Sequence, residues 1–135
     1  SMAVLLVTFV PQPLMTIVPD HSFTMEAAGG NITTVGADGY AVFEIVINNT
    51  GNSDSMVKMT LEDIPGGWSG LLFLTGGPHE GATNVLELPL DYGGTASVTV
   101  RLYVDPDAPP ENYELDLVAT SSGSIETLDL TVTVF

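Results

Sequence analysis

The sequence predicts an all-β protein, an antiparallel β-sandwich of about seven to nine strands. Three observations predict it: apolar and polar residues alternate along many short segments, turn-forming residues separate these segments, and no segment shows helical periodicity over ten residues. The chain has 135 residues, of which 44% are hydrophobic, so it fits one domain with a real core. We expect that domain to span residues 3–135, because Ser1 and Met2 look like a cloning remnant.

The clearest alternation runs through residues 96–104. Every second residue there is apolar, and Ser97, Thr99, Arg101 and Tyr103 between them are predicted on a solvated face. Similar strands are predicted over residues 22–25, 40–48, 56–61, 68–74, 85–90, 113–119 and 128–134. Pro89 places its strand at an edge or a bulge, because proline cannot donate to a ladder.

The turns carry specific expectations. In residues 49–52 the chain must reverse tightly, and Asn or Gly tolerates the left-handed φ that such a reversal can need. Trp68 follows two glycines and is predicted to cover one end of the core. Tyr113 opens a strand after a proline-rich loop, where a corner tyrosine can bond its hydroxyl to nearby backbone. These features favour an immunoglobulin-like sandwich.

The charge balance excludes some functions. The chain has 17 Asp and Glu against 2 Lys and Arg, a formal net charge of −15. Nucleic acid and anionic lipid both need basic side chains to bind, so neither is expected as a partner. A high-salt environment and an ordinary acidic secreted domain both remain open. The chain has no cysteine, which excludes disulfides and thiolate sites and favours an archaeal or bacterial surface.

Four elements in order resemble a known family. They are the strand-to-turn segment 46–52, residues 61–68 ending in Pro65-Gly66-Gly67-Trp68, residues 90–100, and residues 104–113 ending in Tyr113. The chain from about residue 14 to 135 is similar to the NEW3 domain, associated with alpha-galactosidases and archaeal surface proteins, and to the related CARDB-like domains. Tyr92 and Asn112 stand where the family usually has Pro and Gly. The resemblance implies an immunoglobulin-like module of a larger protein.

Residues 3–10 have no counterpart in that pattern. This apolar run is much shorter than the roughly 20 residues of a membrane span and lacks the basic flank of a signal peptide. A buried strand is the favoured interpretation, and the trimmed end of an anchor is the alternative. As a strand it would pair with a sheet edge of its own domain or of a neighbour.

No catalytic group is predicted. The two histidines, His21 and His79, have no nucleophile and orienting group placed with them by any motif, although His79-Glu80 lies in a glycine-rich loop. We expect a non-enzymatic structural or interaction module of an exported or membrane-anchored cell-surface protein, used for spacing, adhesion or assembly. Its partners would be other proteins or neighbouring domains, with a membrane anchor possible outside this segment. The alternative is a carbohydrate-associated accessory module of a glycoside hydrolase.

A few residues are candidates for binding. No cofactor is expected, but loop acids Asp105 and Asp107 offer the oxygen ligands that calcium prefers. Asn31 and Asn48 each begin an Asn-x-Thr triplet, the acceptor for N-glycosylation in an exported protein. Sugar binding would need exposed aromatic rings, for which the candidates are Tyr92, Tyr103 and Phe135.

Overall fold

The computed structural model describes residues 18–36 and 39–135. This part of the chain forms nine strands: β1 (Phe23–Ala27), β2 (Ile32–Val35), β3 (Tyr40–Asn49), β4 (Ser55–Glu62), β5 (Ser69–Leu74), β6 (Val85–Leu90), β7 (Thr95–Tyr103), β8 (Asn112–Ser121) and β9 (Ser124–Val134). The all-β prediction and its strand number are confirmed. The residues before Val18, including the apolar run Ala3–Val10, lie outside the described residues.

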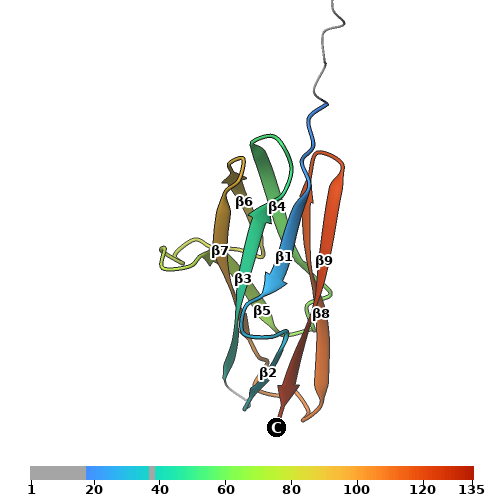
Figure 1. The fold of residues 1–135 in the computed structure, drawn as a ribbon. Helices are drawn as coiled ribbons and strands as arrows, with labels where there is room; N and C mark the ends of the chain where they lie inside the picture. The colour runs from blue at the N-terminus through green and yellow to red at the C-terminus, as the bar shows by residue number, and fades with distance from the viewer. Residues whose placement is uncertain (1–17, 37–38) are drawn as a thin grey trace, which may run out of the picture.

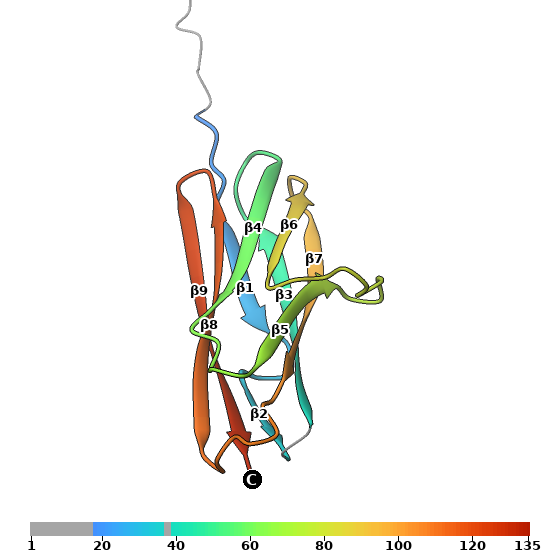
Figure 2. The ribbon, with the colours of Figure 1, turned by 180° about the vertical axis from the view of Figure 1, so that it is seen from behind.

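The strands form two packed sheets (Figures 1 and 2). Sheet A has the order β1-β3-β7-β5, and sheet B has the order β2-β9-β8-β4-β6. All pairs are antiparallel except β2 with β9, which run parallel. The first part of the chain therefore lends one edge strand to each sheet, as an immunoglobulin-like sandwich does.

The core lies between the sheets and is built from the alternating residues that the sequence marks as inward. Its fully buried side chains come from both sheets and include Ile45, Ile47, Val98, Val100, Leu102, Met59, Leu115, Leu117 and Leu130. Successive residues of a strand point to opposite faces, so each buried residue leaves its neighbours on an outer face. We call the side turned away from the other sheet the outer face of each sheet.

The two aromatic landmarks lie as predicted. Trp68 is buried at one end of the core and packs against Tyr113, with ring centroids 4.8 Å apart. The Tyr113 hydroxyl donates a hydrogen bond of 2.8 Å to the Pro109 carbonyl. The pair closes that end of the sandwich, because the tyrosine ring covers the indole while its polar end stays satisfied.

Three sequence expectations need correction or refinement. The strand β2 was not predicted, since it has only four residues and no clean alternation. Thr99 lies on the outer face of β7, as expected, but it is buried. The turn at residues 49–52 has no left-handed residue. Gly51 is needed there for a different reason: a Cβ atom at this position would lie 1.9 Å from the Asp20 carbonyl oxygen.

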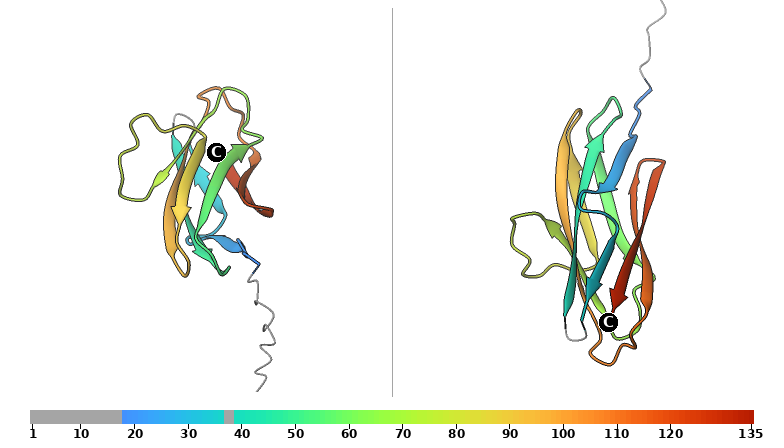
Figure 3. Two further views of the ribbon diagram at one scale, coloured as in Figure 1. Left: turned by 90° about the horizontal axis from the view of Figure 1, so that it is seen from above. Right: turned by 60° about the horizontal axis from the view of Figure 1, so that its bottom comes forward.

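Pro89 lies in β6, the edge strand of sheet B, as its missing N–H requires. β5 is an edge strand of sheet A and lies next to β6. The loop between β5 and β6 crosses from sheet A to sheet B and projects outward (Figure 3). In the part of the chain that the structure describes, no helix long and apolar enough to cross a membrane is present.

Candidate functional site

The outer face of sheet A carries three rows of side chains near the end where β3 begins. Tyr40, Tyr103 and Ser69 are cross-strand neighbours on β3, β7 and β5. Val42, Arg101 and Leu71 form the next row, and Glu44, Thr99 and Phe73 form the third. Side chains directly opposite one another in such a sheet are close enough to pack together. Aromatic and apolar side chains therefore lie side by side with polar ones on this part of the face.

Arg101 is held by aromatic rings within this surface. Its guanidinium carbon lies 5.1 Å from the ring centroid of Tyr40 and 5.5 Å from that of Phe73. These distances are those of cation–π contacts. The Tyr40 and Tyr103 rings are tilted by 51° with centroids 6.0 Å apart. We call Tyr40, Phe73, Arg101 and Tyr103 the aromatic–arginine cluster.

The hydrogen bonding of Arg101 is incomplete. Its Nε atom is buried and has no hydrogen-bond partner among residues 18–36 and 39–135, although the side chain as a whole is only half-buried. Glu44, on the same face of β3, bonds elsewhere. Thr75 Oγ1 lies 2.9 Å from one Glu44 oxygen, and Thr99 Oγ1 lies 3.2 Å from both. Packing, rather than this carboxylate, positions the guanidinium.

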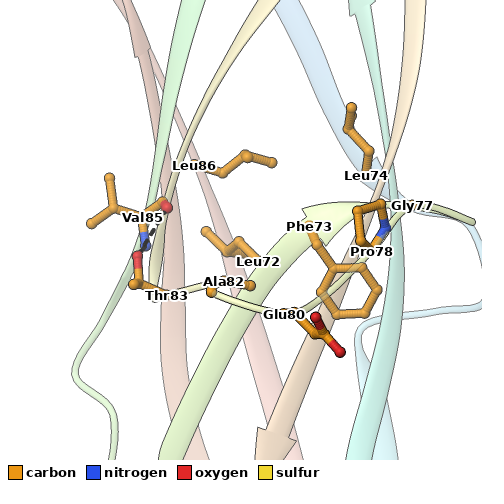
Figure 4. Close-up of a pocket in the computed structure, with 11 residues that line it drawn as sticks. Leu72, Phe73, Leu74, Gly77, Pro78, Glu80, Ala82, Thr83, Val85 and Leu86 are labelled. Carbon is orange, nitrogen blue, oxygen red and sulfur yellow. Dashed lines mark hydrogen bonds between the residues drawn. The ribbon is translucent and has the colours of Figure 1, made fainter.

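A pocket adjoins the cluster at the β5 edge (Figure 4). Its volume is about 350 Å³, and Phe73 lines it together with Leu72, Leu74, Pro78 and Leu86. The β5–β6 loop forms its rim, and the His79 ring lies 5.6 Å from the Phe73 ring. The loop is tied to the edge by the Leu72 amide, which donates a 2.8 Å hydrogen bond to the Thr83 carbonyl. Phe73 thus belongs both to the pocket and to the cluster.

The outer face of sheet B is acidic instead. Asp116 on β8 lies directly opposite Asp129 on β9. The hydrogen bond with the Asp129 carboxyl raises the pKa of Asp116 to about 6, with desolvation, the Asp129 charge and nearby Asp63 acting in the same direction. Two carboxylates in this position repel each other, so a shared proton is favoured.

The predicted calcium ligands serve the loop itself. The Asp105 side chain accepts a 2.9 Å hydrogen bond from the Asp107 amide, and the Asp105 carbonyl accepts one of 2.9 Å from Ala108. This is an aspartate turn, in which the side chain caps its own backbone. Among the described residues, no three His, Asp or Glu side chains gather as a metal site would require. Calcium binding at Asp105 and Asp107 stays an untested prediction.

The three predicted stacking residues are exposed but do not form one site. Tyr92, Tyr103 and Phe135 are 67%, 39% and 73% exposed. Tyr92 lies in the turn before β7 and Tyr103 ends that strand, so β7 separates them. Phe135 follows β9 and its amide bonds the Val35 carbonyl in sheet B. Of the three, Tyr103 has an aromatic neighbour on its own face, Tyr40.

The two predicted glycosylation sites differ in their surroundings. Asn31 precedes β2, is exposed, and its amide donates a 3.0 Å hydrogen bond to the Asp129 carbonyl. Asn48 lies on the outer face of β3, and its side-chain oxygen accepts a 2.6 Å hydrogen bond from Thr95. Both side chains therefore already stabilise neighbouring strands. Modification at Asn31 and Asn48 stays a prediction.

The two histidines lie in different parts of the structure and have different neighbours. His21 Nδ1 lies 2.7 Å from the Ser55 hydroxyl beside β4, whereas His79 packs on Phe73 in the β5–β6 loop. Ser55 is buried, and its hydroxyl also lies 3.5 Å from the Ser53 carbonyl oxygen, to which it donates. A serine and histidine alone do not make a nucleophile, base and orienting group.

Sequence reasoning missed Tyr40 and Phe73 as members of the site. Alternation does mark Tyr40 as outward, because Ala41 and Phe43 are the core residues of β3. Its pairing with Tyr103 depends on the register between β3 and β7, and the two tyrosines are 63 positions apart in the sequence. Phe73 gave no signal at all, since both it and Leu72 are apolar.

The chain resembles known proteins in three-dimensional structure only. No family model matches the chain, and no curated protein matches it. Among solved structures, it is similar to a family 123 glycoside hydrolase from Clostridium perfringens, with a TM-score of 0.53 and 14% identity over 78% of this chain and 23% of that one. It is also similar to a beta-glucosidase from Listeria innocua, with a TM-score of 0.49 and 13% identity over 83% of this chain and 16% of that one.

A third neighbour is a PapD-like domain of human CEP192, with a TM-score of 0.48 and 14% identity, covering 99% of this chain and 95% of that one. The chain thus spans less than a quarter of both enzymes and nearly the whole of the separate domain. The similarity to the Clostridium perfringens enzyme, at 14% identity, indicates a shared fold and nothing about activity. The resemblance to NEW3 and CARDB-like domains stays a prediction.

Proposed function

We propose that this chain is a non-catalytic structural or interaction module of an exported or membrane-anchored cell-surface protein. The observation that carries the proposal is the outer face of sheet A. Tyr40, Val42 and Tyr103 are all exposed and adjacent there. On a protein with a net charge of −15, this group of exposed aromatic and apolar side chains supports a contact with another molecule.

The remaining polar groups support the same proposal. Asp105 caps its loop, Glu44 accepts hydrogen bonds from two threonines, and His21 contacts Ser55. Side chains that are engaged in such hydrogen bonds stabilise the fold, which supports a structural role for them. The NEW3-like order of elements and the lack of cysteine favour the surface of an archaeal or bacterial cell.

Surface labelling tests this proposal. Intact cells of the source organism would be treated with a membrane-impermeant biotin reagent, and the full-length protein would be recovered and quantified. We expect labelling equal to that of a known surface protein and well above that of a cytosolic one. Labelling only after lysis would contradict the proposal, as would turnover of chromogenic glycosides or peptides by the purified chain.

A carbohydrate-associated accessory module of a glycoside hydrolase is the second candidate. The exposed Tyr40–Tyr103 pair favours it, because paired rings can stack on the C–H face of a sugar. The glycoside hydrolase neighbours support the fold only. A glycan array probed with the intact chain tests this candidate, with Tyr103→Ala as the sensitive variant. Binding to no glycan would contradict it.

A further inference from the structure

We propose that the aromatic–arginine cluster binds a glycan whose ring carries a carboxylate, that is, an oligosaccharide containing hexuronic acid. This inference rests on the second candidate function and names its site and its ligand class. The sugar ring would stack on Tyr40 and Tyr103, and its carboxylate would accept hydrogen bonds from the Arg101 guanidinium.

Aromatic rings, and not an acidic side chain, position Arg101. The chain has 17 acidic residues and only 2 basic ones, so a carboxylate partner would be easy to supply from within. Instead the guanidinium lies against the Tyr40 and Phe73 rings, and its Nε is buried with no hydrogen-bond partner among the described residues. Because this packing encloses Nε, only the two terminal nitrogens of the half-buried guanidinium could donate to an external oxyanion, and they form no hydrogen bond with a described residue.

The cluster lies away from the free edges of sheet A. Tyr40, Arg101 and Tyr103 lie on β3 and β7, the two central strands, with β1 and β5 at the edges. An extended peptide binds a sheet by adding a strand at an edge. The central strands have no free edge, so a ligand here must bind through side chains. Ring stacking together with one charged contact meets that requirement.

The negative charge of the chain makes the binding of such a ligand depend on salt. A net charge of −15 repels any anion at long range, and a uronate tetramer, which carries four carboxylates, is therefore repelled strongly at low salt. Salt near 1 M shortens the Debye length to about 3 Å and screens this repulsion. A guanidinium–carboxylate contact is shorter-ranged and persists better. Binding should therefore be stronger at high salt than at low salt, the reverse of simple ion pairing.

A pocket of about 350 Å³ adjoins the cluster at the β5 edge, and Phe73 lines it next to Pro78 and Leu74. Phe73 itself is buried beneath Arg101 and the β5–β6 loop, so it supports the cluster from below. The stacking surface of the proposed site is therefore limited to the exposed rings of Tyr40 and Tyr103.

Calorimetric titration at 1 M NaCl tests the proposal with the whole chain. The probes are tetramers of galacturonic, glucuronic and mannuronic acid, the methyl-esterified galacturonate tetramer as the neutral control, and hexaglutamate as the acidic-peptide control. We expect at least one uronate to bind and the ester to bind at least tenfold more weakly than its acid. Arg101→Met should weaken uronate binding at least tenfold, and Arg101→Lys less. Tyr103→Ala should also weaken it, whereas Tyr92→Ala, at the far end of β7, should not.

The possible failures are distinguishable. Circular dichroism confirms that each variant is folded before titration. If a neutral glycan binds and neither Arg101→Met nor Tyr103→Ala matters, the carbohydrate candidate stands and the proposed site is wrong. If no glycan of either kind binds the folded chain, both are wrong. Equal binding of hexaglutamate and the uronates would also overturn the assignment to a glycan.

Discussion

The outer faces of the two sheets carry different kinds of side chains and interact differently with their own neighbours. On sheet A the residues between the core positions include tyrosines, a phenylalanine and an arginine that pack on one another. On sheet B the equivalent positions of β8 and β9 include Asp116 and Asp129, whose carboxyls oppose each other. Contacts between side chains on the outer face of sheet A therefore stabilise the fold. On the outer face of sheet B, the acidic side chains favour solubility, but the opposed carboxylates repel each other.

Two residues on the outer face of sheet A are buried, although alternation along the strands places them on the solvent side. Phe73 and Thr99 both lie on the outer face of sheet A, yet they are only 7% and 5% exposed. Arg101, Glu44 and the β5–β6 loop cover them. This region is a small second layer of packing outside the main core, and it is also where we place the binding site.

The largest expected effect is the loss of this outer packing. Phe73→Ala should lower the free energy of unfolding by about 3 kcal/mol, as for a buried phenylalanine. The control is Met56→Ala on the outer face of sheet B, where the side chain is 57% exposed and the change should be within about 0.5 kcal/mol. Urea denaturation measures both. Equal effects would mean that the outer face of sheet A has no packing layer of its own.

The two basic residues provide the next test, because there is one on each outer face. Arg101→Met should lower the free energy of unfolding by about 1 kcal/mol, since the cation–π contacts with Tyr40 and Phe73 are lost. Lys58 lies opposite Glu87 on the exposed face of β4, and Lys58→Met should change it by at most about 0.5 kcal/mol. Denaturation at 0.1 and 1 M NaCl checks this: a salt-dependent loss at Arg101 would indicate ion pairing instead.

The smallest effect should appear on sheet B as a dependence on pH. The pKa of Asp116 is raised to about 6 in the folded protein from its ordinary value of 3.8. The folded state therefore holds a proton that the unfolded state has lost, and stability should fall as pH rises from 4 through 6. Asp116→Asn should be more stable than the parent chain above pH 6, with the difference vanishing below pH 4.

Thermal unfolding between pH 3 and 8 measures this effect. Glu87→Gln on the same sheet is the control, because Glu87 lies opposite Lys58 and not opposite another carboxylate. A parent profile parallel to that of Asp116→Asn across the whole range would contradict the shared proton. On sheet A, Glu44 accepts threonine hydroxyls instead of facing another acid. Its replacement by Gln should therefore not remove the pH dependence.

The pattern of residues alone determined the sandwich, its main strands and its end caps. Alternation at Ile45, Val98 and Leu117 needs only local information, because neighbouring residues of any strand point to opposite faces. The corner role of Tyr113 follows likewise from the proline loop that precedes it. The net negative charge and the lack of cysteine follow from composition, and the outward position of Tyr103 follows from alternation along its strand.

Only the tertiary structure decided which outward residues meet. Tyr40, Phe73 and Arg101 come from three strands separated by long stretches of sequence, and the register of β3, β7 and β5 brings them together. The same holds for Asp116 and Asp129 on sheet B. Alternation assigns a side chain to a face but says nothing of its cross-strand partner, and a one-residue slip in register would replace every such pair. The sequence therefore determined the layers of this protein, and strand pairing decided its candidate site.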